Sequence, residues 1–400
     1  MKILQITHKP PLPAIDGGCI AINNITQGLL KSGHEVKVVS MVTSKHPLEK
    51  SKIPENYLHD THFESVFVNT KVRPSQALKS LILNQSYHVS RFVSKEFTAK
   101  LIQILSTETF DIIQLESIFV APYIQTIRQY SKAKIVLRAH NVEHKIWGRF
   151  LINQKNAIKR IVLKKMVNQL KQFEFSVFRE IDAFMAISEP DYLYFNQAFP
   201  ELKGGVIPAG IDVDCYEQDE DYIPSETPQL FHIGSMNWMP NIEGLDWFLE
   251  EVWGKILAQF PELTFTIAGR GIPPKWAQQQ HPNVNIVGEV PNANEFILSK
   301  DIMIVPLLSG SGVRIKILEG MALGKTIITT PIGAEGLNIE NGKNIFIANT
   351  PQEFVEIVEK CIKIPDICKI VGENARNYIT LYHNNEIITQ QIVSLYKEIQ

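Results

Sequence analysis

One stretch of the sequence joins a loop of small residues to a charged segment of helical pattern. The apolar run 301–305 has the composition of a strand, and the loop after it contains Gly310, Ser311 and Gly312. Residues 313–323 are predicted to form a helix, whose first backbone N–H groups lack partners within the helix and favour an anion. The loop and the helix start therefore predict an anion-binding site.

Three charged side chains follow this loop. Arg314 and Lys316 bring positive charge close to it, and Glu319, further along the helix, can accept hydrogen bonds from sugar hydroxyls. These residue types predict a pocket for a phosphorylated ligand. The alternative is an ordinary strand–loop–helix connection with solvated charges, because short Gly/Ser loops are common connectors.

A second candidate loop follows the first strand-like run, residues 2–6. It ends in Gly17 and Gly18 just before a helical pattern, and paired glycines let the backbone approach a ligand closely. No G-x-G-x-x-G follows the first strand, and the later Gly269-Arg270-Gly271 lacks a third glycine, so a nicotinamide enzyme is disfavoured. The alternative is that Gly17 and Gly18 only form a tight turn.

The segment His140-Asn141-Val142-Glu143-His144 matches the H-x-x-E-H pattern of one class of zinc proteases. In those proteins the motif lies within a helix, where two histidines four residues apart share one face. Here His140 comes directly after the strand-like run 134–138, so no metal site is predicted. We expect His140 to face a cleft and to hydrogen-bond the ligand; the alternative is a capping or core role.

Strand-like runs alternate with helix-like segments in both halves of the chain, which is the pattern of parallel α/β sheets. The strand-like runs are residues 2–6, 35–39, 111–115, 134–138, 182–187, 230–233, 263–268, 284–287, 301–305, 326–330 and 344–347. The helix-like segments include residues 21–32, 94–105, 242–259 and 313–323. The predicted fold is α/β, with two Rossmann-like doubly wound domains that face a central cleft lined by strand ends.

The length of 400 residues suits two domains. Residues 209–228 are rich in acidic and turn residues and have the composition of a linker. We therefore expect a first domain over residues 1–209 and a second over residues 210–385. The terminal segment 386–400 has a helical pattern and is expected to pack back on the first domain.

Charge is unevenly spread along the chain. Residues 1–200 hold 26 Lys and Arg against 16 Asp and Glu, whereas residues 201–400 hold 14 against 26. The basic half suits an anionic acceptor or an anionic membrane, and the acidic half argues against nucleic acid as a partner; the alternative is mutual attraction of the two domains. Segment 155–171 interleaves cations with apolar residues, so it either lies on anionic lipid or packs its apolar stripe on its own domain.

Three features predict a cytoplasmic location, with peripheral contact at the inner face of the membrane as an option. No apolar run approaches the ~20 residues that cross a bilayer. The first residues have the pattern of a strand and not of a signal peptide. The cysteines are expected to be reduced and structural, because their spacings match no metal or redox motif; they are Cys19, Cys215, Cys361 and Cys368.

These motifs together resemble the retaining glycosyltransferases of family 4 (group 1), which have the GT-B fold and use nucleotide-sugar donors without a metal. The resemblance covers nearly the whole chain and keeps the order of the segments 17–18, 140–144, 188–191, 208–212, 234–236, 311–319 and 333–337. It implies a hexosyltransferase that uses a nucleotide-diphosphate sugar. The implied acceptor is a glycan or a lipid-linked molecule in the synthesis of a surface polysaccharide or glycoconjugate.

The resemblance also implies a role for individual residues. Gly18 would approach the donor diphosphate or the acceptor, His140 would contact the transferring sugar, and Glu319 would hold the ribose. The implied catalytic residues are His140, Arg314 and Lys316. The implied donor-binding residues are Gly17, Gly18, Gly234, Ser235, Arg270, Val290, Gly310, Ser311, Gly312 and Glu319. No cofactor and no metal are implied.

The sequence departs from the family pattern at four positions, one of which is Ala209 in Ala209-Gly210, where the family usually has Asn-Gly at the linker. Ser311 stands where the family has a glutamate eight residues before Glu319, and Ser235 and Asn241 stand where an arginine and a lysine are common. Arg314 and Lys316, with Arg270 as a further candidate, are then left to neutralise phosphate. Two alternatives to a transferase are a GT-B sugar-nucleotide epimerase and a non-catalytic glycan-binding partner.

Overall fold

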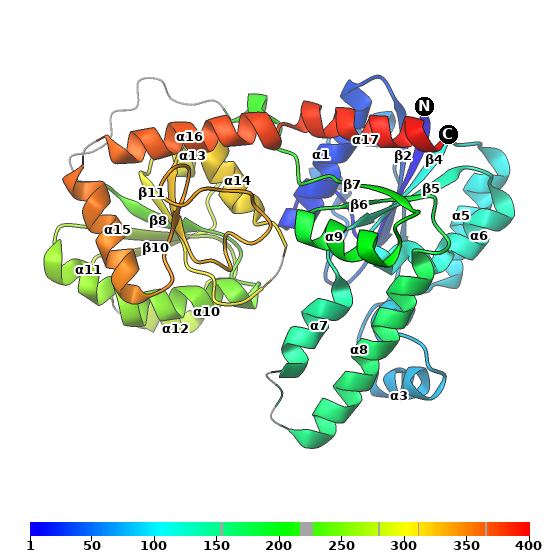
Figure 1. Cartoon of the computed structure of the whole chain (residues 1–400), viewed down its shortest axis with the longest axis horizontal. Helices are drawn as coiled ribbons and strands as arrows, with labels where there is room; N and C mark the ends of the chain where they lie inside the picture. The colour runs from blue at the N-terminus through cyan, green and yellow to red at the C-terminus, as the bar shows by residue number, and fades with distance from the viewer. Residues whose placement is uncertain (153, 155, 217–226, 279–280, 311, 365) are drawn as a thin grey trace. The chain divides into compact units, whose positions relative to one another are not determined.

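Each half of the chain builds its own parallel β-sheet, as the computed structural model shows (Figure 1). The structure describes residues 1–400 except 153, 155, 217–226, 279–280, 311 and 365. The chain divides into two compact units, Met1–Pro208 with Ile388–Gln400, and Ala209–Ile387. The boundary expected at residue 210 lies beside this division.

The first unit contains a seven-stranded sheet of order β3-β2-β1-β4-β5-β6-β7, and all of its pairings are parallel. The strands are β1 (Lys2–Thr7), β2 (Glu35–Val42), β3 (Glu64–Phe67), β4 (Ile112–Glu116), β5 (Lys134–Ala139), β6 (Ala183–Ala186) and β7 (Lys203–Val206). The helices are α1 (Gly17–Lys31), α2 (Glu55–Asp60), α3 (Pro74–Ile82), α4 (Tyr87–Ser90), α5 (Lys95–Thr107), α6 (Ile124–Tyr130), α7 (Glu143–Ile152), α8 (Ala157–Val177), α9 (Glu189–Ala198) and α17 (Asn385–Ile399).

Apolar residues cover both faces of this sheet, because successive side chains of a strand point to opposite faces. Leu4 belongs to the core cluster that includes residues of α5, α6 and α9. Ile3 belongs to the cluster on the other face, where α1 and α17 contribute. The fully buried Ile388, Ile392 and Tyr396 of α17 are part of that second cluster, so the end of the chain completes the core of the first unit.

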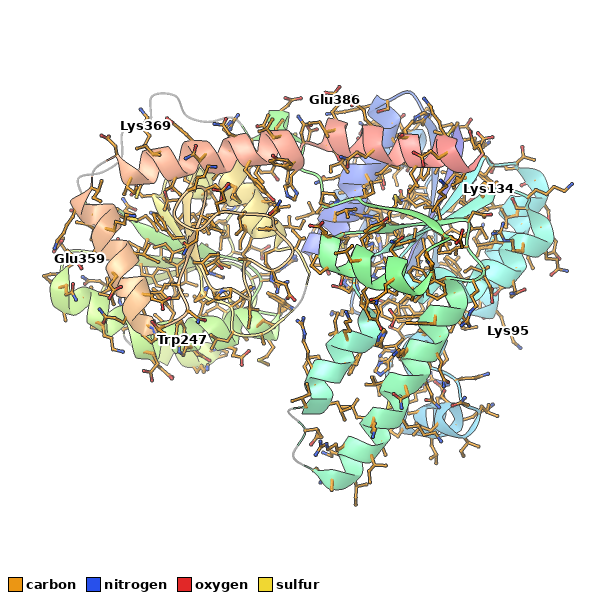
Figure 2. All side chains as sticks on the ribbon, viewed as in Figure 1. Lys95, Lys134, Trp247, Glu359, Lys369 and Glu386 are labelled. Atoms are coloured by element: carbon orange, nitrogen blue, oxygen red, sulfur yellow. The ribbon has the colours of Figure 1, made fainter. Side chains whose placement is uncertain are left out.

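The second unit contains a six-stranded parallel sheet of order β10-β9-β8-β11-β12-β13. Its strands are β8 (Leu230–Ile233), β9 (Phe265–Ala268), β10 (Val284–Gly288), β11 (Ile302–Val305), β12 (Thr326–Thr329) and β13 (Phe346–Ile347). Its helices are α10 (Met239–Trp247), α11 (Gly254–Gln259), α12 (Pro274–Gln278), α13 (Ala293–Leu298), α14 (Ile315–Ala322), α15 (Pro351–Lys363) and α16 (Ile367–Tyr382). Trp247 of α10, labelled in Figure 2, packs against Phe354 of α15 with ring centroids 5.7 Å apart.

Both sheets have a point where the strand order reverses direction. In the first sheet this point lies between β1 and β4, and in the second it lies between β8 and β11. Ligands of doubly wound sheets bind beyond the carboxyl ends of the strands at such a switch point. The loops after β1 and β4, and after β8 and β11, are therefore the places where function is expected.

The sequence did not predict two strands, β3 and β7, and both lie at edges of the first sheet. The β7 segment Lys203-Gly204-Gly205-Val206 looks like a turn because glycine is disfavoured in strands. Gly204 is needed there because a Cβ atom would lie 2.3 Å from the ring of Phe184 on β6. Close packing by a neighbour therefore explains this strand better than propensity does.

The prediction of a linker over residues 209–228 is wrong for the first part of this segment. Ala209 and Ile211 are buried, and Ile211 forms a bridge with Asn384. The backbone O of Tyr216 accepts a hydrogen bond of 2.7 Å from Arg376 of α16. Residues 209–216 therefore pack in the second unit, although the acidic composition of the segment predicted a linker. Residues 217–226 lie outside the described residues.

Candidate functional site

In the first unit, His140 and Glu116 meet at the carboxyl edge of the sheet. Glu116 is the last residue of β4, and His140 directly follows β5, so parallel pairing brings them side by side. Nε2 of His140 lies 2.7 Å from Oε2 of Glu116. Arg138 of β5 donates to the same oxygen at 3.4 Å, and both Glu116 and Arg138 are fully buried.

A buried polar network holds the Glu116 carboxylate in place. Gln5 of β1 donates to its Oε1 at 3.0 Å, and Gln114 donates to the same oxygen. Tyr396 of α17 donates in turn to the side-chain oxygen of Gln114. Burial alone would raise the pKa of Glu116, but Arg138, His140 and Gln5 outweigh it and lower the pKa to about 2. Glu116 is therefore ionised at neutral pH.

These contacts define the protonation state of His140. Burial lowers the pKa of its imidazole, and this effect outweighs the contribution of Glu116, which raises the pKa. A neutral ring beside an ionised carboxylate must donate from Nε2, because the carboxylate only accepts. His140 therefore keeps the lone pair of Nδ1 and is an acceptor for a ligand hydroxyl. The ring of His8 lies nearby, with centroids 5.9 Å apart.

The loop after β1 places a charged pair beside the paired glycines. Nζ of Lys9 lies 2.7 Å from Oδ1 of Asp16, and Nε2 of His46 lies 2.9 Å from Oδ2. Asp16 also caps α1, which begins at Gly17, by accepting from the backbone N of Cys19. These partners outweigh burial and hold the pKa of Asp16 well below its usual range.

Gly18 is the residue over which this pair lies. A Cβ atom at position 18 would meet Nζ of Lys9 at 2.3 Å and Oδ1 of Asp16 at 3.3 Å. The glycine thus leaves room for the ammonium group at the start of α1. Gly18 therefore does more than form a tight turn, since it accommodates a cation.

The two histidines of the H-x-x-E-H motif contact different partners. His144 lies in α7, and its Nδ1 is 2.5 Å from Oε2 of Glu174 on α8, whereas His140 contacts Glu116. Nε2 of His144 is 2.9 Å from the hydroxyl of Tyr194. Within the described ranges, no group of three or more His, Cys, Asp or Glu side chains is placed to hold a metal ion.

In the second unit, Lys316 reaches from α14 to the strand–loop junction after β8. Its Nζ donates to Oδ1 of Asn241 at 2.8 Å and lies 3.2 Å from Nε2 of His232. Gly234 makes room for this contact, because a Cβ atom there would lie 2.5 Å from Nζ. Burial, with the nearby charge of Arg314, lowers the pKa of Lys316 to about 7, against the opposing effect of Glu319.

Arg314 is the N-cap residue of α14 and is buried. It donates to the backbone O of Gly312 and, at 3.3 Å, to that of Ile332. Its guanidinium carbon lies 5.6 Å from the ring centre of Trp238, a cation–π distance. Gly310 has a φ of +114°, a backbone conformation that favours glycine, and it lies beside both groups. Ser311 is outside the described residues.

Glu319 lies on the next turn of α14 and accepts a hydrogen bond of 3.3 Å from the hydroxyl of Tyr216. Burial raises the pKa of Glu319, while Tyr216 and Lys316 act in the opposite direction. A carboxylate at this position has acceptor capacity for a ligand hydroxyl.

The remaining predicted donor-site residues lie in loops at the same carboxyl edge of the second sheet. Ser235 follows β8, Arg270 follows β9 and Val290 follows β10. The backbone O of Ser235 accepts from Asn241 at 2.8 Å, and that of Arg270 accepts from the backbone N of Met236 at 2.8 Å. The structure thus brings the β8 and β9 loops into direct contact.

Sequence reasoning missed several groups that the structure brings to these sites: Lys9, Asp16, Glu116, Tyr216, His232 and Trp238. Glu116 had a visible signal, because a glutamate in an apolar strand needs partners. His232 had the same signal within the strand Leu230-Phe231-His232-Ile233. Tyr216 had none, because it follows acidic residues in a segment with linker composition.

Comparisons with known proteins show the class of the protein. Residues 227–363 match the family model described as Glycosyl transferases group 1. An uncharacterized 44.6 kDa protein in a cps region of Klebsiella pneumoniae is 24% identical, and the match covers 98% of each chain.

Solved structures show the same architecture along the whole chain. HepE from Anabaena, solved in complex with UDP-glucose, has a TM-score of 0.66 at 16% identity and covers 100% of both chains. Sucrose-phosphate synthase from Thermosynechococcus elongatus has a TM-score of 0.68 at 14% identity, over 100% of this chain and 99% of that chain. The chain is a glycosyltransferase of GT-B fold, and its second unit carries the group 1 domain.

Proposed function

We propose that this glycosyltransferase is a retaining, family 4 type enzyme that moves a hexosyl group from a nucleotide-diphosphate sugar to a glycan or lipid-linked acceptor. The observation that carries the proposal is the placement of Lys316 and Arg314 at the start of α14, at the switch point of the second sheet. Two cations and an acidic residue, Glu319, on one helix suit a diphosphate joined to a ribose.

On the donor side, Arg314, Lys316 and the loop containing Gly310, Ser311 and Gly312 would hold the diphosphate. Its negative charge would raise the pKa of Lys316, which burial has lowered, and so favour the ammonium form. Glu319 would accept from the ribose hydroxyls, with Gly234, Ser235, Arg270 and Val290 in the surrounding loops. The complex of HepE with UDP-glucose supports a nucleotide sugar as the donor.

At the reacting carbon, the bond from C1 of the sugar to the diphosphate oxygen breaks as the bond from C1 to the acceptor oxygen forms on the same face. The acceptor proton passes to the leaving phosphate oxygen, so no pair of catalytic carboxylates is required. Preorganised cations stabilise the charge that develops on the leaving group. We propose metal-independent chemistry because Arg314 and Lys316 supply two positive charges, with His140 accepting from a sugar hydroxyl.

The proposed pathway is the synthesis of a surface polysaccharide or similar glycoconjugate. The similarity to a protein of a cps region in Klebsiella pneumoniae over 98% of both chains supports it. The cytoplasmic location is part of the same proposal, and four free cysteines without redox spacing in the sequence support it.

A panel of UDP-, GDP- and ADP-hexoses tests the donor site, because a ligand that binds only the folded state raises its thermal stability. We expect one nucleotide series to raise Tm with and without EDTA, and Lys316→Ala and Arg314→Ala to weaken that shift. Lys300→Ala, outside the site, is the matched control. No shift with any series, or unchanged shifts in both site variants, would overturn the assignment.

Turnover separates the proposed transferase from its alternatives. A transferase consumes the donor in proportion to a glycosylated acceptor, whereas an epimerase changes the sugar without an acceptor. A glycan-binding protein binds the donor and never consumes it. Release of UDP or GDP that depends on an added glycan or lipid-linked acceptor is the expected result.

A further inference from the structure

Two segments of the first unit account for its positive charge. Residues 65–95 and 144–173 hold 13 Lys and Arg and no Asp or Glu. That is half of the 26 Lys and Arg in residues 1–200. The 13 cations exceed the net positive charge of residues 1–200, because the other 13 cations there are outnumbered by 16 Asp and Glu. The basic character of this half is therefore local, and it belongs to α3, α7 and α8 with their flanking residues.

The fold brings these two segments together. Nε2 of Gln169 on α8 lies 3.4 Å from the backbone O of Ser80 and of Leu81 on α3, and 3.3 Å from Oδ1 of Asn84. At the base of α7, the Glu174 carboxylate of α8 accepts from the backbone N–H groups of residues 143 and 144. Figure 1 shows α7 and α8 running away from the sheet of the first unit, with α3 beside α8. We call α3, α7 and α8 the basic projection.

The basic projection also exposes large apolar side chains. Ile158 is 76% exposed, Ile161 is 71% exposed and Ile82 is 74% exposed. Ten of the 20 exposed large hydrophobic residues in the described part of the chain lie in residues 67–83 and 150–162: Phe67, Val72, Leu78, Ile82, Leu83, Phe150, Ile152, Ile158, Ile161 and Val162. The interpretation that helix 155–171 packs its whole apolar stripe on its own domain is therefore wrong for the first half of α8.

Cations surround these apolar residues on the same helix. Lys159, Arg160, Lys164 and Lys165 are exposed beside Ile158, Ile161 and Val162. Because residues 144–173 contain no acidic residue, this part of α8 offers no carboxylate to pair with them. Exposed aliphatic side chains flanked by lysine and arginine match an interface that is apolar inside and negatively charged at its surface.

We infer that the basic projection docks on an anionic phospholipid bilayer, with its apolar side chains inserted among the lipids and its cations at the headgroups. Lipid fits better than a second copy of the chain, because two such surfaces carry the same charge and repel. It fits better than nucleic acid, because the exposed side chains are mainly aliphatic and do not stack on bases. Among the described residues no helix is long and apolar enough to span a bilayer, so the contact is peripheral.

Docking here has a consequence for the site in the same unit. Helix α7 begins three residues after His140, and its base is fixed to α8 through Glu174. The projection is thus joined directly to the loop that carries His140. The inference does not depend on the identity of the donor, and it can be tested without one.

The test is flotation of the full-length protein with two kinds of vesicle, phosphatidylcholine alone and equal parts of phosphatidylcholine and phosphatidylglycerol, at about 0.1 M and about 0.5 M NaCl. The apolar variant carries Ile158→Gln and Ile161→Gln. The cation variant carries Lys159→Gln, Arg160→Gln, Lys164→Gln and Lys165→Gln. The control variant has as many exposed residues changed as the cation variant, all of them outside the basic projection. Its changes are Lys203→Gln, Lys255→Gln, Lys369→Gln and Leu381→Gln, and Lys369 on α16 is labelled in Figure 2.

We expect the wild type to float with the anionic vesicles, less at high salt, and not with phosphatidylcholine alone. Each projection variant should lose roughly tenfold or more of this partition, while the control variant keeps it. Circular dichroism and an unchanged Tm show that each variant is folded, since all changed residues are exposed. Equal binding to both vesicle types, equal loss in the control variant, or no wild-type binding would overturn the inference. Self-association or RNA binding lost in the projection variants without vesicle binding would also overturn it.

Discussion

Nζ of Lys316 lies 3.2 Å from Nε2 of His232, whose Nδ1 donates to the backbone O of Ile304 at 2.7 Å. A ring that donates from Nδ1 and faces an ammonium group must be neutral and accept through Nε2. Burial and the charge of Lys316 hold the pKa of His232 well below its usual range. The second sheet thus offers the lysine a neutral acceptor, so this contact leaves the charge of the lysine available to a ligand.

This arrangement predicts that diphosphate binding takes up a proton. The pKa of Lys316 is lowered to about 7, so at pH 8 the free site is mostly deprotonated, whereas bound phosphate favours the ammonium form. Titration calorimetry with UDP at pH 8 in Tris and in HEPES should show an uptake that approaches one proton per site. Affinity should fall up to about tenfold per pH unit above pH 8.

Two controls assign this uptake to Lys316. Lys316→Met should bind UDP weakly and without the difference between buffers, and Lys300→Met should behave as the wild type. The free protein should lose stability from this group as pH falls from about 10.5 to about 7, because the unfolded chain takes up the lysine proton near pH 10.5 and the folded chain takes it up only near pH 7. Identical binding enthalpies in the two buffers for the wild type would contradict the prediction.

A second prediction concerns the glycine beneath this ammonium. In Gly234→Ala the new Cβ would lie 2.5 Å from Nζ of Lys316 and 3.0 Å from Nδ2 of Asn241. The flexible end of the lysine should move away, so we expect roughly tenfold or more weaker UDP binding and little change in Tm. Calorimetry and thermal unfolding of the same sample measure both effects.

Gly254→Ala is the matched control. No atom lies within 4 Å of a Cβ at this position, and its φ of −59° is helical. Alanine should stabilise the protein by about 0.5–1 kcal/mol there and leave UDP affinity unchanged. If Gly234→Ala binds UDP as the wild type does, Lys316 does not contact the diphosphate.

The sequence predicted the parts of the site that local pattern determines. The strand before His140, the loop containing Gly310 and the helix carrying Lys316 follow from composition and order along the chain. Their partners do not, because Glu116 reaches His140 only when β4 and β5 are neighbours, and Gln5 joins them only when β1 lies beside β4. Strand order is a property of the whole sheet and is not readable from any one segment.

Local pattern also misled in two places. The edge strand β7 contains Gly204, which is required by the ring of Phe184 and not by a turn. The segment before residue 217 has a linker composition, yet Ile211 is buried and Tyr216 bonds to Glu319. In both cases tertiary packing outweighs the intrinsic preference of the residues.

A third prediction uses the raised pKa of Glu143. Burial, with the nearby Glu174 and Asp191, raises this pKa to about 7, although Asn141 opposes the shift. The folded state therefore loses stability from this group as pH rises from the unfolded pKa near 4.5 towards 7. Glu143→Gln should be more stable than the wild type at pH 8 by on the order of 1 kcal/mol, and much less so at pH 5.

Urea unfolding at the two pH values measures this difference. Glu373→Gln changes an exposed glutamate of α16 and should give no pH-dependent gain. A gain of equal size at both pH values would mean that a packing change, and not the charge of Glu143, causes it.

The last prediction concerns the buried pair beneath His140. Glu116 and Arg138 are both fully buried, so Glu116→Gln leaves the Arg138 charge without its counter-ion. We expect a loss of roughly 3–5 kcal/mol of unfolding free energy, whereas Glu359→Gln in the surface pair with Lys363 should cost less than about 1 kcal/mol. Urea unfolding at pH 7 measures both losses.

The fall of the unfolding free energy at acidic pH provides the second readout for this pair. The pKa of Glu116 is about 2 in the folded state against an ordinary value of 4.5, so its contribution is complete above pH 4.5 and disappears as pH falls to about 2. Glu116→Gln should lack this part of the acid-induced loss. Adding Arg138→Met should recover part of the stability, because the uncompensated charge is then absent. If the double variant is as unstable as the sum of the single variants, Glu116 and Arg138 do not interact, and the carboxylate is held beside His140 by its amide partners alone.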